Sequence, residues 1–294
     1  MEKHSFSNID SVGDLILSAS RILATSDSSR LDSELLLAHV LRTDRTGLLV
    51  RFRETLSDEH VNQFGKLVDR RRSGEPVAYI VGEKEFYGRS FEVNPSVLIP
   101  RPESELLVDE ALASFALKKT ASILDLGTGS GCLAVSLTSE LLSKGVDARS
   151  VAVDRSAEAL AVARKNAQRY GTAEAIEFVE SDWYSSLEGE QGRFDVIVAN
   201  PPYVVCDEPL ARELSFEPPS ALFSAEEGLC DARQIIEGAT QFLQPEGVLL
   251  CEVGAYKMAH VERLLAEYRD LYRISYLGDQ DDLDRFLVLR LERM

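Results

Sequence analysis

Apolar residues recur at helical spacing through the first part of the chain. After Ser11, a typical N-cap residue, apolar side chains stand at positions 12, 15, 16, 19, 22 and 23, which is the pattern of an amphipathic helix. Residues 30–41 are apolar over most of the helical circumference and predict a helix in the middle of a small bundle. A third helix is predicted from residue 57 until Gly74 ends it. We therefore expect residues 1–75 to form a helical domain.

The pattern changes twice beyond this domain. In residues 76–104, aromatic and β-branched residues are interrupted by glycine and proline, which predicts a linker that carries a β-hairpin. In residues 105–294, helical patterns alternate with apolar strand candidates, which are SILDLG, SVAVD, AIEFVE, FDVIVANPP, GVLLCEVG and RFLVLRL. This alternation is typical of βαβ units and predicts an α/β domain, with a largely parallel sheet and helices on both faces.

A glycine-rich turn follows the first of these strands. The stretch SILDLGTGSGCLAVSL reads as strand, turn and helix, so the turn lies at the carboxyl edge of the sheet, where open α/β folds bind ligands. Gly127, Gly129 and Gly131 let the backbone approach a ligand more closely than a Cβ would permit. The spacing is GxGxG and not the GxGxxG of dinucleotide sites, so a tight turn without a ligand remains an alternative at this point.

Acidic and aromatic residues follow the next two strands. Asp154 ends the strand SVAVD, where a carboxylate can accept hydrogen bonds from both ribose hydroxyls, and this favours adenosine binding. Asp154 could instead cap the following helix, although Ser156 suits that position as well. After the third strand, Asp182 is placed to accept from an adenine amino group and Trp183 to lie against the ring, unless this single tryptophan belongs to the core.

The fourth strand ends in Asn-Pro-Pro-Tyr, at the same edge as the glycine turn. Pro201 and Pro202 fix φ and remove two backbone donors, which stiffens the turn and leaves carbonyl oxygens free to accept. An NH₂ group has two hydrogens to donate, which the Asn200 side-chain oxygen and the Pro201 carbonyl can accept while Tyr203 stacks on the planar group. The nitrogen lone pair then faces an electrophile, so the turn predicts methylation of an amide or aryl amine, with catalysis mainly by positioning.

Composition restricts the class of partner. The 294 residues include 49 acidic and 32 basic side chains, for a formal charge of −17, with 45% apolar residues. Such an acidic globular protein repels a phosphate backbone, so we expect no direct nucleic-acid ligand. The run Arg70, Arg71 and Arg72 is interpreted as a solvated helix end in preference to a contact for an acidic partner.

Targeting and metal signals are both missing from the sequence. It has no N-terminal apolar targeting segment and no run of eighteen apolar residues, so we expect a cytoplasmic protein without a membrane span. The four cysteines and four histidines are scattered without the close pairing of zinc sites, and we predict buried free thiols and no metal.

Together, DLGTGSG, Asp154, SDW and NPPY resemble a class I S-adenosylmethionine-dependent methyltransferase of the amino-methylating type. The stretch EPVAYIVGEKEFYGRSFEVNPSVLIPRPESE further resembles the release-factor glutamine methyltransferases, the HemK/PrmC family, as do RLDSELLLAHVL near the start and FEPPSALFSAEEGL after the fourth strand. The resemblance covers nearly the whole chain. It implies a Rossmann-like sheet, mostly parallel with an antiparallel last strand, preceded by a helical bundle and a hairpin linker.

The resemblance also implies an activity and its residues. The reaction would methylate the side-chain amide nitrogen of the glutamine in the Gly-Gly-Gln loop of peptide-chain release factors, with S-adenosylmethionine as donor. Because a single glutamine on a loop offers little specificity, we also predict that the N-terminal bundle and the linker recognise the body of the factor. A monomer is expected. The implied cofactor-binding residues are Gly127, Thr128, Gly129, Ser130, Gly131, Asp154, Asp182, Trp183 and Asn200. The implied substrate-binding residues are Asn200, Pro201, Pro202, Tyr203, Arg101 and Ser104, of which Asn200, Pro201 and Tyr203 are the catalytic set.

Two departures from the family pattern stand out. The family's IPRPETE reads IPRPESE here, with the hydroxyl retained in Ser104. Where related sequences often have an acidic residue, Gly and then Gln, this chain has Tyr256 and Lys257 near that position, so the role of that glutamine does not transfer.

Three other functions remain open from the sequence. A ribosomal-protein glutamine methyltransferase shares the cofactor loop and NPPY, but Arg101-Pro102-Glu103 favours the release-factor branch. A DNA or RNA adenine N6-methyltransferase would use the same turn, but the acidity of the chain argues against it. A nucleotide-binding module without enzymatic activity would leave NPPY unexplained.

Overall fold

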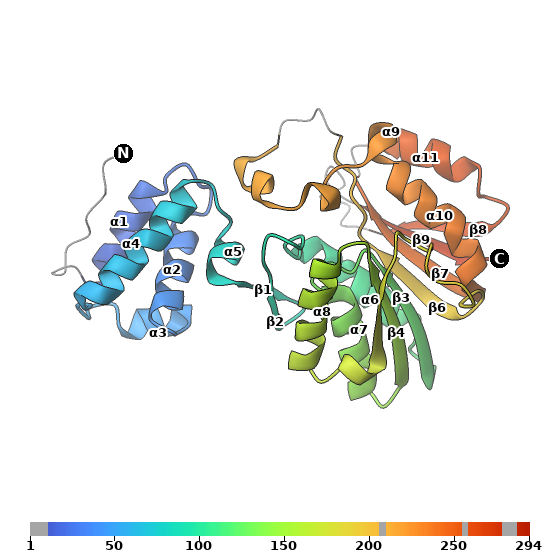
Figure 1. Ribbon diagram of the computed structural model, residues 1–294, viewed down its shortest axis with the longest axis horizontal. Coiled ribbons are helices and arrows are strands. Elements are labelled where there is room, and N and C mark those ends of the chain that lie inside the picture. The colour runs from blue at the N-terminus through green and yellow to red at the C-terminus, as the bar shows by residue number, and fades with distance from the viewer. Residues whose placement is uncertain (1–10, 206–209, 255–257, 278–286) are drawn as a thin grey trace. The chain divides into compact units, whose positions relative to one another are not determined.

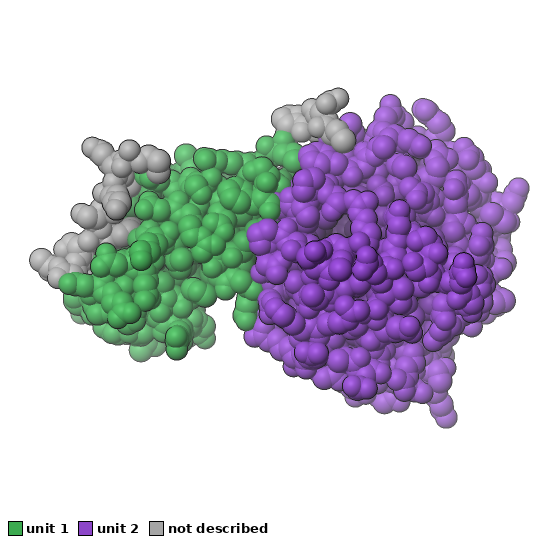
Figure 2. Space-filling model, viewed as in Figure 1, with its two compact units in different colours: residues 1–83, 210–216 green, residues 84–209, 217–294 purple. Residues whose placement is uncertain are grey.

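The chain forms two compact units (Figure 2). The computed structural model describes residues 11–205, 210–254, 258–277 and 287–294. Unit 1 contains residues 1–83 and 210–216, and unit 2 contains residues 84–209 and 217–294. The division into three domains at residues 75 and 104 stays a prediction, whereas the structure groups the residues into these two units.

Unit 1 is a helical bundle. Its helices are α1 (Val12–Ile22), α2 (Ser29–Val40), α3 (Arg45–Val50), α4 (Asp58–Arg72) and α5 (Val77–Val81). The predicted N-cap of α1 is confirmed, because Ser11 Oγ accepts from the Asp14 backbone N–H and the Asp14 carboxylate accepts from the Ser11 backbone N–H. This reciprocal capping satisfies backbone donors that the first turn of a helix leaves unpaired.

Helix α2 buries a charge on one of its faces. The prediction of a helix in the middle of the bundle is confirmed, because α2 contacts α1, α3, α4 and α5, although Leu31 and Leu35 are exposed on one face. The buried part instead includes Asp32, whose carboxylate accepts from Arg71 Nε of α4 at 2.7 Å and from Ser26 Oγ at 2.8 Å. A carboxylate is retained inside the bundle because these groups replace its water.

The arginine run at the end of α4 is mostly paired within the unit. The interpretation as a solvated helix end is wrong for Arg71, which is 6% exposed and bonds to Glu213 in addition to Asp32. Arg70 donates to Glu75 at 2.8 Å and 2.5 Å, and Arg72 lies 3.7 Å from an acidic neighbour on α4. Arg71 therefore links α4 to α2 and to the 210–216 segment, whereas Arg70 and Arg72 pair locally at the end of α4.

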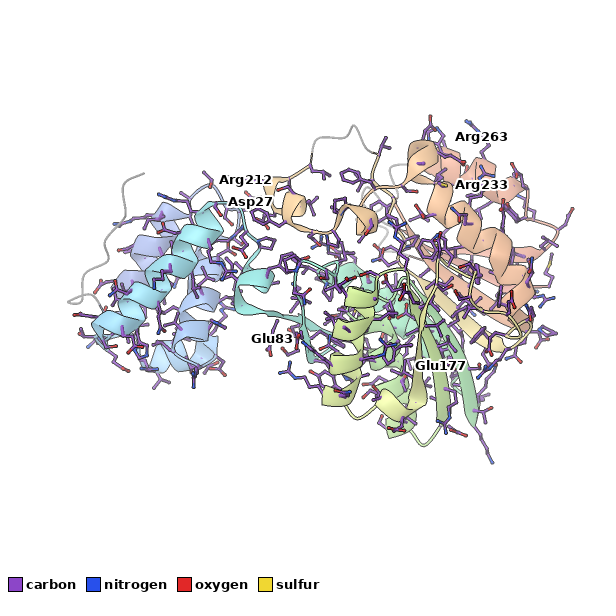
Figure 3. The ribbon with its side chains drawn as sticks, viewed as in Figure 1. Asp27, Glu83, Glu177, Arg212, Arg233 and Arg263 are labelled. Carbon is purple, nitrogen blue, oxygen red and sulfur yellow. The ribbon has the colours of Figure 1, made fainter. Side chains whose placement is uncertain are left out.

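The segment 210–216 belongs to unit 1 although it comes late in the chain. The short 3₁₀ helix Arg212–Phe216 supplies Glu213 to Arg71. The side chain of Arg212 (Figure 3) lies over Gly74, because a Cβ added to Gly74 would stand 2.8 Å from the Arg212 Cδ and Cγ atoms. Gly74 also has a φ of +99°, so both the backbone conformation and the available space require glycine there.

Unit 2 begins with a β-hairpin and ends in a seven-stranded sheet (Figure 1). The hairpin strands are β1 (Glu83–Phe86) and β2 (Arg89–Glu92). Tyr87 and Gly88 connect them with φ of +51° and +68°, which is the geometry of a tight two-residue hairpin turn. The predicted hairpin is thus confirmed.

The large sheet has the order β5-β4-β3-β6-β7-β9-β8. Its strands are β3 (Thr120–Leu126), β4 (Asp147–Asp154), β5 (Ile176–Glu180), β6 (Phe194–Ala199), β7 (Leu243–Val253), β8 (Tyr272–Leu277) and β9 (Leu287–Arg293). The first five strands in spatial order are parallel, and β9 is antiparallel to both of its neighbours. The predicted α/β fold and its antiparallel last strand are confirmed.

Helices cover both faces of this sheet (Figure 1). They are α6 (Glu105–Ala113), α7 (Cys132–Ser143), α8 (Ala157–Arg169), α9 (Ala225–Gly228), α10 (Cys230–Phe242) and α11 (Met258–Ala266). Successive strand residues enter different cores: Val198 packs in the cluster that contains residues of α6 and α7, and Ile197 packs in the cluster of α10 and α11. Two buried faces explain why the strands read as continuous apolar runs.

Some details of unit 2 differ from the expectations. Strand β8 was not predicted, although Tyr272 is buried and its hydroxyl donates to the Ile236 carbonyl at 3.1 Å. The prediction of buried free thiols is confirmed for Cys251, whereas Cys132 and Cys230 are half-buried. Cys206 lies outside the described residues, as do Tyr256 and Lys257. Among the described residues, no helix is both long and apolar enough to cross a bilayer.

The buried pair in unit 1 leads to a stability prediction. We expect Asp32→Ala to lower the free energy of unfolding of unit 1 by about 3 kcal/mol, because it leaves the buried Arg71 with only part of its counter-charge. The matched control is Arg30→Ala, which removes an ion pair whose arginine side chain is 74% exposed and should cost less than about 1 kcal/mol. Hydrogen exchange of amides in α2 and α4 measures both; equal effects would contradict a buried structural pair.

Candidate active site

Four parallel strands end at one level of the sheet. Strand β3 lies between β4 and β6, so the chain winds outward in two directions from it, and ligands bind at such a switch point. The strand register pairs Leu126 with Val153 and with Ala199, and Ala199 with Cys251. The residues that follow these positions are Gly127, Asp154, Asn200 and Glu252. Three predicted site residues therefore share the carboxyl edge of the sheet with Glu252, to which the sequence assigned no role.

The glycine turn between β3 and α7 has a conformation that other residues rarely adopt. Gly127, Gly129 and Gly131 have φ of +72°, +54° and +79°. A Cβ on Gly131 would lie 3.0 Å from the Ala163 Cβ, so Gly131 is needed for the packing of α8 against the turn. Around Gly129, the nearest atom to such a Cβ would be 4.0 Å away, so this part of the turn leaves space beside the backbone.

Hydrogen bonds from neighbouring polar groups hold the glycine turn in place. The buried Asp125 Oδ2 accepts from Thr128 Oγ1 at 2.6 Å and from the Ala134 backbone N–H at 3.1 Å, which links the start of the turn to α7. Burial raises the pKa of Asp125 to about 7, against the lowering effect of these two hydrogen bonds. From the other side, Asn166 Nδ2 donates to the Ser130 carbonyl at 2.8 Å. These hydrogen bonds therefore fasten the turn to α7 and α8.

Asp154 faces the turn from the end of β4. Its Oδ2 accepts from the Gly129 backbone N–H and its Oδ1 from the Ser156 backbone N–H, both at 2.9 Å. Ser156, and not Asp154, is the N-cap of α8. Burial raises the pKa of Asp154 above its ordinary value, against the lowering effect of these backbone donors. Each carboxylate oxygen keeps acceptor capacity beyond its one backbone bond, as recognition of two ribose hydroxyls requires.

Trp183 lies beside the glycine turn and lines a pocket together with it. Its ring would stand 3.2 Å from a Cβ on Gly127, so the indole lies against the glycine turn. The indole N–H donates to Asp231 Oδ1 of α10 at 3.2 Å, and the side chain also packs on the α10 and α11 core. The core and ligand-binding interpretations of this tryptophan are thus compatible, because one edge of the ring is buried while the residue lines the pocket with Asp182.

Asn200 is held by a chain of hydrogen bonds to a buried acid. Asn200 Nδ2 donates to Ser104 Oγ at 2.8 Å, and Ser104 Oγ donates to Glu252 Oε2 at 2.6 Å. Ser104 is 3% exposed and Glu252 2%. Burial raises the pKa of Glu252 to about 7; the hydrogen bond from Ser104 lowers it, the Glu103 charge raises it, and Arg101 and Asn200 lower it. The buried carboxyl of Glu252 therefore lies behind Asn200, the predicted catalytic asparagine, and Ser104 links the two.

Arg101 forms part of the pocket rim. Its Nη2 donates to Glu217 Oε1 at 2.5 Å, and Glu217 Oε2 accepts from the Ile99 backbone N–H at 3.0 Å. Glu217 is 4% exposed, so a buried carboxylate joins the segment before α6 to the Pro218–Ala221 segment. Arg101 and Pro218 both line the pocket.

One pocket brings together most of the predicted site. It is lined by Gly127, Thr128, Gly129, Ser130, Asp154, Asp182, Trp183, Asn200, Pro202, Arg101 and Ser104, among others. Gly131, Pro201 and Tyr203 adjoin these residues in sequence but are not part of the lining. Their roles, and those of the lining residues, stay predictions.

The pocket fits the cofactor that the sequence implies. It is lined by both polar and apolar residues, as small-molecule sites are. The backbone at Gly129, the carboxylate of Asp154 and the indole of Trp183 offer a close backbone surface, hydrogen-bond acceptors and an aromatic wall. Groups of these three kinds suit the methionine, ribose and adenine parts of S-adenosylmethionine.

Sequence reasoning missed three residues that support the site: Glu252, Glu217 and Asp231. Glu252 lies inside an apolar strand, and its charge in the run LLCEVG was the available signal. Glu217 belongs to the stretch FEPPSAL that carried part of the resemblance. Asp231 has no sequence signal, because its role depends on the packing of α10 beside Trp183.

Comparison with known proteins agrees with this geometry. Residues 14–82 match the PrmC N-terminal domain, and residues 117–283 match a methyltransferase domain. The release factor glutamine methyltransferase of Nitratidesulfovibrio vulgaris is 42% identical over 271 residues, which cover 91% of this chain and 90% of that protein. The release factor glutamine methyltransferase of Escherichia coli K12 is 39% identical over 263 residues, covering 88% and 92%.

A solved structure is similar in fold. The crystal structure of a methyltransferase from Pyrococcus furiosus matches with a TM-score of 0.50 at 18% identity, over 71% of this chain and 91% of that one. At this identity the likeness concerns the fold alone. It agrees with the Rossmann-like sheet that the strand order displays.

The position of Asp154 leads to a binding prediction. We expect Asp154→Ala to weaken the binding of S-adenosylhomocysteine by about 10- to 100-fold, because a carboxylate that accepts two hydroxyls is lost. The control is Asp147→Ala, at the other end of β4, where the side chain is 68% exposed; its affinity should stay at the wild-type value. Isothermal titration calorimetry measures both, and equal affinities for the two variants would remove Asp154 from the site.

Proposed function

The chain belongs to the release factor glutamine methyltransferase family, and we propose that it methylates the side-chain amide nitrogen (N5) of the glutamine in the Gly-Gly-Gln loop of peptide-chain release factors. It is a methyltransferase, and its methyl donor is S-adenosylmethionine. The observation that carries the proposal is the fixed amide of Asn200, one strand away from the glycine turn.

The lining of the pocket supports the proposed roles of the cofactor-binding residues. When bound, S-adenosylmethionine supplies an electrophilic methyl group on a sulfonium. The turn from Gly127 to Gly131 holds the methionine part, Asp154 the ribose, and Asp182 with Trp183 the adenine. Because hydrogen bonds fasten the turn to α7 and α8, we expect little free energy to be lost in ordering it.

The Asn200 turn orients the substrate. The glutamine NH₂ donates one hydrogen to Asn200 Oδ1 and the other to the Pro201 carbonyl, while Tyr203 stacks on the planar amide. Its nitrogen lone pair is delocalised and weakly nucleophilic, so orientation supplies most of the catalysis. In the transfer, the amide nitrogen would form a bond to the methyl carbon as that carbon's bond to sulfur breaks, S-adenosylhomocysteine would be the leaving group, and the nitrogen would afterwards lose a proton to solvent. No general base is needed before attack.

Unit 1 recognises the body of the release factor in this proposal. A single glutamine on a loop gives little specificity, whereas unit 1 exposes several large apolar side chains on α1, on α3 and just after α3, which we call the α1–α3 patch. They are Leu17 (53% exposed), Leu49 (68%), Val50 (85%) and Phe52 (47%). A Cβ on Gly13 would meet the Phe52 ring, so Phe52 lies over α1, one turn from Leu17. Exposed apolar side chains of this size support the binding of a protein partner.

The remaining parts of the proposal concern the setting. The protein acts as a monomer in the cytoplasm, where release factors are found, and it binds no nucleic acid directly. The formal charge of −17 supports the last point, since a phosphate backbone would be repelled.

The proposed role of Asn200 is tested by substitution. We expect Asn200→Ala to lower kcat for methylation of a release factor by about a hundredfold or more, because a preorganised acceptor is lost. The affinity for S-adenosylhomocysteine should change little. Steady-state transfer of labelled methyl measures the first quantity and calorimetry the second. A variant with near-normal kcat would refute this assignment.

The α1–α3 patch is tested by charge. We expect Val50→Asp to raise KM for the intact release factor about tenfold or more with kcat nearly unchanged, because an apolar contact would have to bury a carboxylate. Methylation of a short peptide with the Gly-Gly-Gln sequence should not change. Leu117→Asp, at a residue of unit 2 that is 99% exposed, is the control and should leave both substrates unaffected. An unchanged KM in Val50→Asp would exclude the patch.

A further inference from the structure

The hydrogen-bond chain behind Asn200 has a direction that the donors and acceptors dictate. A serine hydroxyl has one hydrogen, and Ser104 places it on Glu252 Oε2 at 2.6 Å. Ser104 Oγ can then only accept from Asn200, so the amide branch that faces it at 2.8 Å must be the NH₂ group. The other branch of the amide, Oδ1, is therefore the one that Asn200 can offer to a substrate donor.

We infer that Ser104 and Glu252 are positioning residues which fix the Asn200 side chain with its oxygen presented to the substrate amide. The inference rests on the proposed function, because it matters only if the substrate group donates hydrogens. A turned amide would present NH₂ to NH₂, which gives no hydrogen bond and places two donors in contact.

The register of β6 and β7 brings Asn200 and Glu252 close enough for a single residue, Ser104, to link them by hydrogen bonds. Ala199 of β6 pairs with Cys251 of β7 in parallel, so Asn200 and Glu252 follow at the same level and on the same side of the sheet. Ser104 comes from the segment just before α6 and inserts its hydroxyl between them. The buried carboxyl costs folding free energy unless it is hydrogen-bonded, and no ion pair to Glu252 occurs among the described side chains, so Ser104 and Asn200 are what compensates it.

The direction of the chain depends on the charge of Glu252. Ionised, the carboxylate can only accept, so Ser104 must donate to it. Protonated, it can donate to Ser104 Oγ, which frees the serine hydrogen for Asn200 Oδ1 and allows the amide to turn. The charged groups that act on Glu252 are Glu103 and Arg101, with Ser104 and Asn200 as its hydrogen-bonding neighbours. Since burial raises the pKa of Glu252 to about 7, the oxygen-out arrangement is favoured above that pH.

The test compares a variant that keeps the chain of hydrogen bonds with variants that alter or break it. Ser104→Thr keeps the hydroxyl and should retain kcat within about threefold at pH 8, whereas Glu252→Gln has an NH₂ donor in place of the OH of the protonated acid and should hold kcat near the low-pH wild-type value at every pH. Glu252→Ala and Ser104→Ala break the chain, and we expect kcat to fall at least tenfold while KM for the cofactor changes little.

Two controls separate positioning from a loss of stability. Ser136→Ala removes a buried hydroxyl of α7 that has no hydrogen-bond partner in the described part of the chain, and Asp195→Asn neutralises a buried acid at the far end of β6, paired with Lys118. Neither should change kcat. If Ser104→Ala and Glu252→Ala are as active as these controls, the positioning role is refuted.

The pH profile and the NMR signal of the amide give readouts that a merely structural role would not move. Wild-type kcat should fall as pH drops through about 7, and Glu252→Gln should lose this dependence. The Asn200 side-chain NH₂ resonances, assigned by their absence in Asn200→Ala, should shift over the same pH range in the wild type and not in Glu252→Gln. This second readout needs no turnover. A wild-type enzyme that methylates no release factor would refute the proposed function. NH₂ resonances that show the same pH dependence in the wild type and in Glu252→Gln would refute the positioning role of Glu252.

Discussion

The parallel register of β3, β6 and β7 is the constraint on which the site depends. It sets the last apolar residues of these strands side by side, so that the glycine turn, Asn200 and Glu252 follow at one level. A shift of one residue in β6 would turn Asn200 to the opposite face of the sheet, because strand side chains alternate. The apolar residues of β6, all buried, prevent that shift by packing into two different cores.

Three acidic side chains of the site belong to strands that are otherwise largely apolar. Asp125, Asp154 and Glu252 all have raised pKa values for which burial is the largest cause. Each carboxyl accepts from specific donors, which are Thr128 for Asp125, backbone N–H groups for Asp154 and Ser104 for Glu252, although Asp125 Oδ1 has no hydrogen-bond partner among the described residues. These bonds fix the glycine turn and the asparagine in place, which is the arrangement expected of a catalyst that works mainly by orientation. Burying these carboxyls costs folding free energy, and the hydrogen bonds that offset part of this cost also hold the groups of the site in position.

The sequence predicted the parts of this molecule that depend on local pattern. The alternation of apolar strand candidates with helical patterns predicted the α/β fold, and Ser11 predicted the start of α1. It did not predict β8, or the burial of Arg71 against Asp32, since these two residues come from different helices and their pairing is tertiary. Glu252 was missed for a similar reason: its importance comes from Ser104, which is distant in sequence and close only in the fold. A local sequence pattern does not predict which residues pair when they lie far apart in the chain.

Mass spectrometry of a release factor after incubation with the enzyme and isotopically labelled S-adenosylmethionine tests the central claim most directly. The account predicts a single labelled methyl group, on the side-chain nitrogen of the glutamine in the Gly-Gly-Gln loop, and none when that glutamine is replaced. Label on another residue, or an unlabelled release factor in the presence of enzyme that binds the cofactor, would contradict it.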